Sequence, residues 1–120
     1  MIDVKRVADE IEGKINELGR GRADLAWRAE KKAAAIAEYD KRVSMVLMGL
    51  KNGKSYMLDG EEIKDPPASY SERLARGICW KEKYEAEKAE AEYKNSTVGM
   101  DSLMAELNGW QSINRYLEAK

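Results

Sequence analysis

A chain of 120 residues has the usual length of one domain, so we predict a single domain over residues 1–120. Charged residues make up 36% of the chain and only two residues are proline, a composition that favours helices and disfavours a β-sandwich or an open α/β sheet. A net charge of −1 excludes a general electrostatic attraction to nucleic acid or to a membrane surface, and the absence of histidine removes the commonest general base and metal ligand.

The first predicted helix spans residues 3–51 and begins at Asp3, whose carboxylate is a good N-cap. Its apolar residues alternate at steps of four and three, the spacing of a seam that faces another helix, and only Arg22 and Lys32 interrupt the series. We predict that the helix continues through residues 19–22, where two glycines leave a turn as the alternative. The apolar members of this seam are Val4, Ala8, Ile11, Ile15, Leu18, Leu25, Ala29, Ile36, Tyr39, Val43, Val46 and Leu50.

A short β-hairpin is predicted over residues 54–65. It follows an Asn-Gly pair at 52–53, which is typical of the end of a helix. Asp-Gly at 59–60 indicates a two-residue type I′ turn. Pairing about this turn sets Tyr56 opposite Ile63.

The second long helix is predicted over residues 69–119. Ser69 and Glu72 have the spacing of a capping box at its start, and residues 95–99 are its weakest stretch. Its seam repeats the pattern of the first helix, with three polar members. The seam contains Ala75, Cys79, Glu82, Ala86, Ala89, Tyr93, Ser96, Met100, Leu103, Leu107, Trp110, Asn114 and Leu117.

Two seams of similar length joined by a short connector predict a predominantly all-α fold. We expect a long antiparallel helical hairpin, or coiled coil, with the β-hairpin at its tip. Folding about the turn brings together positions whose residue numbers add up to about 120, so Val4 is expected near Leu117.

Further apolar residues lie outside both seams, and a patch of that size is unusual on a monomer. We therefore predict self-association into a helical bundle, most simply a homodimer with a four-helix core. The expected oligomer interface lies toward the tip and comprises Met45, Leu47, Met48, Ile78, Trp80 and Tyr84.

A moderately basic stretch in the first helix offers an alternative surface. Cationic side chains beside an aromatic ring can contact phosphates and stack on a base. The candidate nucleic-acid face comprises Arg20, Arg22, Trp27, Arg28, Lys31 and Lys32. Three acidic residues, Glu17, Asp24 and Glu30, fall in the same stretch and favour an ordinary solvated helix face.

No catalytic, phosphate-binding or metal-binding motif occurs in the sequence, so we predict no enzymatic activity, no cofactor and no bound metal. Cys79 is the only cysteine, which excludes an intrachain disulfide, and no histidine can activate its thiol. We expect it to be a small buried apolar residue. No segment approaches the roughly 20 apolar residues that span a bilayer, and we expect a cytoplasmic location.

The C-terminal part of the chain carries a family resemblance. Glu-Ala-Glu-Tyr-Lys at 90–94, followed by an apolar heptad pattern that ends in Trp-Gln-Ser-Ile-Asn-Arg at 110–115, resembles small helical proteins encoded in bacteriophages and prophages. Such proteins are often encoded near replication or recombination genes, and they mostly lack an assigned activity. The resemblance implies a location in the bacterial host cytoplasm.

These observations predict a non-enzymatic protein of phage or prophage type that acts through contacts with itself and with another phage or host protein. The alternative function is an accessory nucleic-acid-binding factor in phage replication or recombination.

Overall fold

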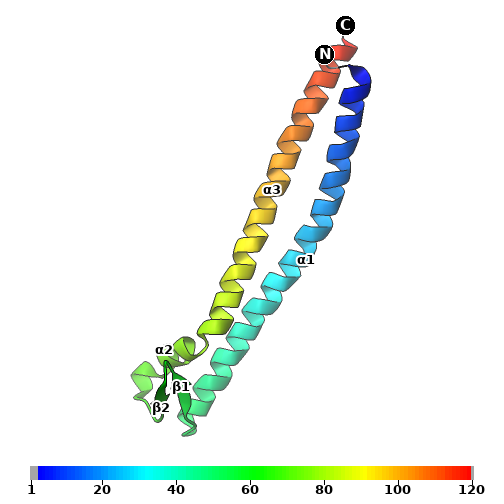
Figure 1. Cartoon of the computed structure of the whole chain (residues 1–120). Coiled ribbons are helices and arrows are strands. Elements are labelled where there is room, and N and C mark those ends of the chain that lie inside the picture. The colour runs from blue at the N-terminus through cyan, green and yellow to red at the C-terminus, as the bar shows by residue number, and fades with distance from the viewer. Residues whose placement is uncertain (1–2, 120) are drawn as a thin grey trace. The chain divides into compact units, whose positions relative to one another are not determined.

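A computed structural model describes residues 3–119 (Figure 1). The elements in chain order are α1 (Val4–Lys51), β1 (Tyr56–Leu58), β2 (Glu61–Ile63), α2 (Ala68–Ile78) and α3 (Trp80–Glu118). The predicted fold class is confirmed: the chain is a helical hairpin with a short two-stranded antiparallel sheet between its helical arms. α1 passes through the two glycines at 19 and 21 without interruption, as predicted.

Contacts between residues divide the chain into two compact units. Unit 1 comprises Met1–Ala29 and Glu92–Lys120, and unit 2 comprises Glu30–Ala91. The assignment of residues 1–120 to a single domain stays a prediction.

In unit 1, α1 and α3 lie antiparallel in the predicted register. Lys14 Nζ lies 2.6 Å from Glu106 Oε2, and Arg28 NH1 lies 3.5 Å from Glu92 Oε2. Both pairs have residue numbers that add up to 120, the expected sum. The N-cap is also confirmed, because the backbone N–H of Arg6 donates to Asp3 Oδ1 at 2.7 Å.

The seam of α1 is confirmed in one row except at Val4, which is 58% exposed, and it is wrong in part of the other row. Ile11, Leu18, Leu25, Tyr39 and Val46 are buried or half-buried, as expected. The second row was expected to include Ala8, Ile15 and Ile36, but all three are exposed.

The row that faces α3 in unit 1 instead contains Val7, Lys14, Gly21 and Arg28, and Val7 is fully buried. Both rows have heptad spacing, so apolar periodicity alone does not choose between them. The glutamates of α3 select the row that carries Lys14 and Arg28, because only that row pairs with them.

Unit 2 begins with the rest of α1, which ends as the Asn-Gly pair predicts. Gly53 has φ of +81°, and its N–H donates to the carbonyl of Leu50, while Lys54 N–H donates to the carbonyl of Gly49. These two bonds form a Schellman motif, which satisfies carbonyls at the end of the helix.

The β-hairpin is confirmed with its predicted turn and register. Asp59 and Gly60 both have positive φ, as a type I′ turn requires. Tyr56 pairs with Ile63, and the strands pair antiparallel throughout.

The core of unit 2 lies beside this sheet. Val46 and Leu50 of α1 pack with Ala75 of α2 and with Cys79, and Tyr56 of β1 packs against them. Burial of Cys79 is confirmed, since its exposed fraction is 0%.

The helix predicted over residues 69–119 is wrong in its continuity, because Cys79 separates α2 from α3. Cys79 is the single non-helical residue between them, with φ of −90° and ψ of 28°. α2 packs against β1. The capping box is wrong as well. Pro67 is the N-cap without a side-chain hydrogen bond, Ser69 lies within the first turn, and the Glu72 carboxylate pairs with Arg76 at 2.8 Å instead.

The α3 seam agrees with the sequence pattern. Ala86, Ala89 and Leu107 are buried, and Met100 and Trp110 are half-buried. The three buried residues are members of the predicted stripe, so the heptad pattern of α3 identifies its buried side.

Candidate interaction site

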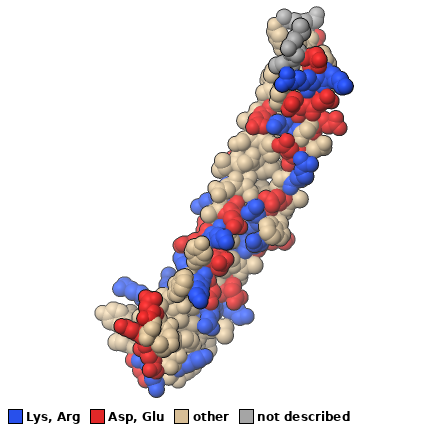
Figure 2. All heavy atoms as spheres, viewed as in Figure 1, with Lys and Arg blue, Asp and Glu red and all other residues tan. Residues whose placement is uncertain are grey.

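Charged side chains of both signs are interspersed over the face seen in Figure 2, without a large area of one sign. Surface charge therefore gives no single docking direction for a polyanion on this face.

The predicted oligomer interface is not one continuous surface. Leu47 and Ile78 pack against the core of unit 2, whereas Met45, Met48, Trp80 and Tyr84 are exposed. At 100° per residue, Met45 and Met48 project about 160° and about 100° from Leu47 around the α1 axis. Leu47 and the two methionines therefore face different directions.

The predicted nucleic-acid face is divided in a similar way. Trp27 and Lys31 each project within about 20° of Arg20 around α1, and about 40° from each other, whereas Arg22 projects about 160° from Arg20. Arg20, Arg22, Trp27 and Lys31 are exposed, and Lys32 is half-buried. Three of the six residues thus share one exposed face.

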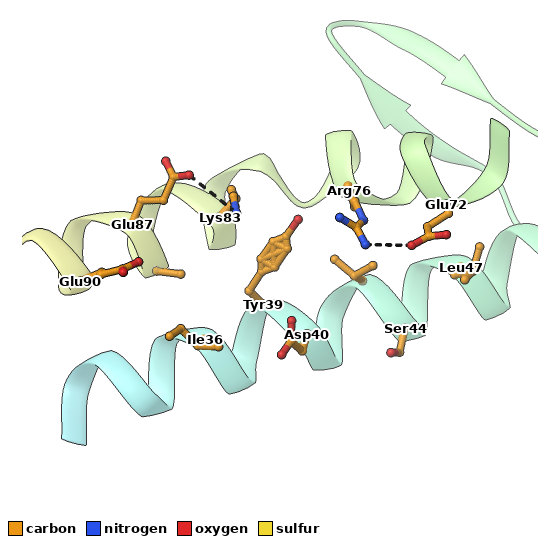
Figure 3. Close-up of a pocket in the computed structure, with 12 residues that line it drawn as sticks. Ile36, Tyr39, Asp40, Ser44, Leu47, Glu72, Arg76, Lys83, Glu87 and Glu90 are labelled. Carbon is orange, nitrogen blue, oxygen red and sulfur yellow. Dashed lines mark hydrogen bonds and ion pairs between the residues drawn. The ribbon is translucent and has the colours of Figure 1, made fainter. Parts of the chain in front are cut away.

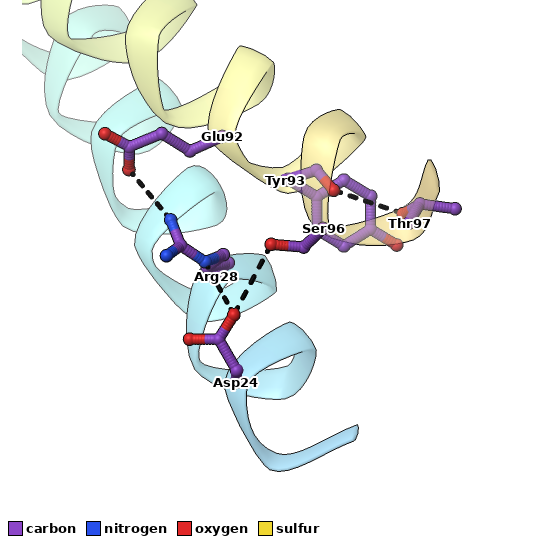
Figure 4. A network of polar contacts seen from close by, with 6 residues as sticks. All are labelled: Asp24, Arg28, Glu92, Tyr93, Ser96 and Thr97. Carbon is purple, nitrogen blue, oxygen red and sulfur yellow. Dashed lines mark hydrogen bonds and ion pairs between the residues drawn. The ribbon is translucent and has the colours of Figure 1, made fainter. Parts of the chain in front are cut away.

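Arg28, the sixth of these residues, belongs to a polar network inside unit 1 (Figure 4). Its Nε donates to Asp24 Oδ2 at 2.8 Å, and its NH1 donates to Glu92 Oε2 at 3.5 Å. Ser96 Oγ donates to the same Asp24 oxygen at 3.4 Å. The hydrogen bond to Asp24 raises the pKa of Arg28 above its usual value. Two carboxylates of the same chain, those of Asp24 and Glu92, therefore bind the guanidinium that was predicted to contact phosphate.

Unit 1 exposes more large apolar side chains than it buries. Among its described residues, the buried hydrophobic residues are Val7, Leu18 and Leu107. Six large hydrophobic residues of the unit are exposed: Val4, Ile15, Trp27, Val98, Met104 and Tyr116. A helix pair with this distribution has apolar surface available for further helices.

Unit 2 contains an open groove of about 570 Å³ (Figure 3). α1 forms one side, and α2 with the beginning of α3 forms the other. Ile36, Tyr39, Val43 and Leu47 of α1 give it an apolar lining, and the small side chain of Ala86 leaves space on α3. Tyr39 rises from α1 toward α3, and Lys83 Nζ lies 5.2 Å from the centroid of its ring.

The charged edge of the groove is made by residues of all three helices. Arg76 pairs with Glu72 at 2.8 Å, and Lys83 pairs with Glu87 at 3.7 Å. The other ionisable carboxylates of the lining belong to Asp40 and Glu90. The carboxylates thus outnumber the cations four to two, and the groove has a net negative edge.

The sequence did not predict this groove, because Ile36, Tyr39 and Val43 belong to the predicted seam, which was expected to face the other long helix. The available signal was the width of the apolar stripe on α1. A single antiparallel partner covers two rows of a heptad, so a third apolar row indicates surface left over for another helix.

Comparisons of the chain with protein-family models, with curated proteins and with solved structures give no match. Within residues 3–119, no helix combines the length and the apolar character that crossing a bilayer needs. The same residues contain no group of three or more acidic or cysteine side chains placed to hold a metal ion.

Proposed function

We propose that this protein is non-enzymatic and acts by self-association, most simply as a homodimer with a four-helix core. The observation that carries this proposal is the composition of unit 1, which buries three hydrophobic residues while leaving six large ones exposed. A second copy that packs on unit 1 would cover part of this surface.

Ile15 and Met104 mark the proposed contact in unit 1. Their numbers add up to 119, so the register of the Lys14–Glu106 pair places them at one level of the helix pair. Their exposed fractions are 52% and 44%. In unit 2, the predicted interface also has exposed members, among them Met48 and Trp80.

Sedimentation equilibrium of the unmodified chain tests the proposal. We expect a mass that rises with concentration toward twice the 13.6 kDa of one chain. The double substitution Ile15→Glu and Met104→Glu should weaken the dimer at least tenfold, because an uncompensated charge in an apolar interface costs about 1.4 kcal/mol or more.

Val98→Glu is the matched control, since Val98 is exposed but projects about 120° from Met104 around the α3 axis, and it should leave the mass unchanged. A mass of one chain at every concentration would refute self-association.

An accessory nucleic-acid-binding role is the second candidate, and the shared face of Arg20, Trp27 and Lys31 favours it. A dimer would double this charge. The expected result is a DNA affinity that falls steeply with salt and is lost in Arg20→Glu. The absence of any mobility shift at low salt would remove this candidate.

We also propose that the protein originates from a phage or prophage and is located in the cytoplasm of the bacterial host. The sequence resemblance over residues 90–115 supports them. A non-enzymatic protein that associates through helices fits that class.

A further inference from the structure

The sulfur-containing side chains at the surface of this protein are methionines. The one thiol of the chain belongs to Cys79, whose exposed fraction is 0%, so an oxidant does not reach it in the folded chain. Four methionines, by contrast, are exposed by 44% to 64%: Met45, Met48, Met57 and Met104. A peroxide that meets the folded chain therefore reaches thioethers before it reaches the thiol.

Met104 differs from the other exposed methionines in its position. Met45, Met48 and Met57 belong to unit 2, whereas Met104 belongs to unit 1. Within unit 1 it lies at the level of Ile15, on the proposed contact between two copies. Of the four exposed thioethers, the one on Met104 is therefore the one that the proposed contact of unit 1 would cover.

Met100, one turn before Met104 on α3, has a different environment. Its side chain is half-buried, and its sulfur lies over Gly21 of α1, in the space that a Cβ at that position would occupy. This packing against α1 limits the access of an oxidant to the sulfur. The helix thus carries one packed thioether and one exposed thioether in unit 1.

Oxidation changes Met104 from an apolar side chain to a polar one. The sulfur lone pair attacks one oxygen of hydrogen peroxide, an S–O bond forms, the O–O bond breaks, and the other oxygen leaves as water. The sulfur loses two electrons and the peroxide gains them. The resulting sulfoxide has to give up its hydrogen bonds to water when an apolar contact covers it, which opposes association.

We propose that Met104 is a peroxide modification site, and that its oxidation to the sulfoxide switches off self-association through unit 1. This inference rests on the proposed function, because it names the regulation of the same contact. Association also covers the Met104 thioether, so the dimer slows its oxidation. Peroxide then acts on the monomer, and the chain responds most strongly when it is dilute.

Sedimentation equilibrium before and after treatment with hydrogen peroxide tests the inference, with oxidation at each methionine followed by peptide mass spectrometry. Oxidation of Met104 is expected to raise the dissociation constant of the dimer at least about tenfold. Met104→Leu keeps an apolar side chain without an oxidisable sulfur, so this variant should stay dimeric after the same treatment. Met57→Leu is the matched control in β1, and it should respond to peroxide as the unmodified chain does.

Two further measurements do not depend on complete oxidation. Met104→Gln places a permanent polar group at the contact and should weaken the untreated dimer about tenfold, whereas Met57→Gln should leave it unchanged. The rate of oxidation at Met104 should fall as the protein concentration rises, while the rate at Met57 stays constant.

A dimer that persists after Met104 has been oxidised would overturn the inference and leave self-association intact. Dissociation of the Met104→Leu dimer by peroxide would also overturn it, because another residue would then carry the effect. A chain that is monomeric at every concentration before treatment would refute self-association and, with it, this regulation.

Discussion

Replacing Gly49 by alanine should lower the free energy of unfolding, whereas the same replacement at Gly19 should raise it. Both glycines lie inside α1, where alanine is favoured over glycine by about 1 kcal/mol. A Cβ added at Gly19 has no atom within 4 Å, so we expect the full gain there. A Cβ at Gly49 would overlap the Tyr56 hydroxyl and lie 3.0 Å from two ring carbons.

The Tyr56 ring packs against the core of unit 2, so it cannot move freely. Overpacking of this kind costs about 1–3 kcal/mol, which equals or exceeds the propensity gain. We therefore expect Gly49→Ala to be less stable than Gly19→Ala by about 1–3 kcal/mol.

Urea unfolding followed by circular dichroism measures this difference. Tyr56→Phe removes the closest atom, so combining it with Gly49→Ala should recover part of the loss. If the two alanine variants unfold at the same urea concentration, with unchanged dependence of the unfolding free energy on urea, the close approach of Tyr56 to α1 is refuted.

Three further predictions concern the seam and the core. Lys14→Glu should lower the midpoint of thermal unfolding, and combining it with Glu106→Lys should restore that midpoint. The hydrogen bond to Glu106 raises the pKa of Lys14. The contribution of this pair to the stability of the fold is therefore present below the ordinary lysine pKa and is lost as pH rises through the raised pKa. Burial raises the pKa of the Cys79 thiol, so a thiol reagent at mildly alkaline pH should label it only after unfolding. Leu107→Asp should cost about 3 kcal/mol or more and abolish most helical circular dichroism, because Leu107 is 7% exposed.

Local signals in the sequence predict the parts of the fold that depend on neighbouring residues. The Asp3 cap, the Gly53 helix end and the Asp59-Gly60 turn each require only a few residues and one backbone geometry. The α3 seam is also predictable, because the buried residues Ala86, Ala89 and Leu107 all fall on one heptad stripe.

The remaining features depend on contacts between distant segments. Ile15 and Lys14 both fit a heptad row, and the choice between them depends on Glu106, which lies far along the chain. Cys79 is neither glycine nor proline, and Gly77, two residues before it, lies inside α2, so the local sequence does not mark the position of the interruption. The groove depends on that interruption and on the third apolar row together, which explains why the sequence pattern did not reveal it.

The row of α1 that contains Lys14 and Arg28 both fixes the register of unit 1 and leaves apolar side chains exposed. A purely apolar heptad seam tolerates a slip of seven residues, because each side chain finds an equivalent partner. In unit 1 such a slip would set Lys14 opposite Gly99 or Ile113, and neither side chain can accept its hydrogen bond.

The Lys14–Glu106 and Arg28–Glu92 pairs therefore disfavour a slipped register. Since these cations occupy positions facing α3, Ile15 of the neighbouring heptad row is left on the surface of unit 1. The same residues that fix the register of unit 1 thus leave exposed the apolar surface on which the proposed self-association depends.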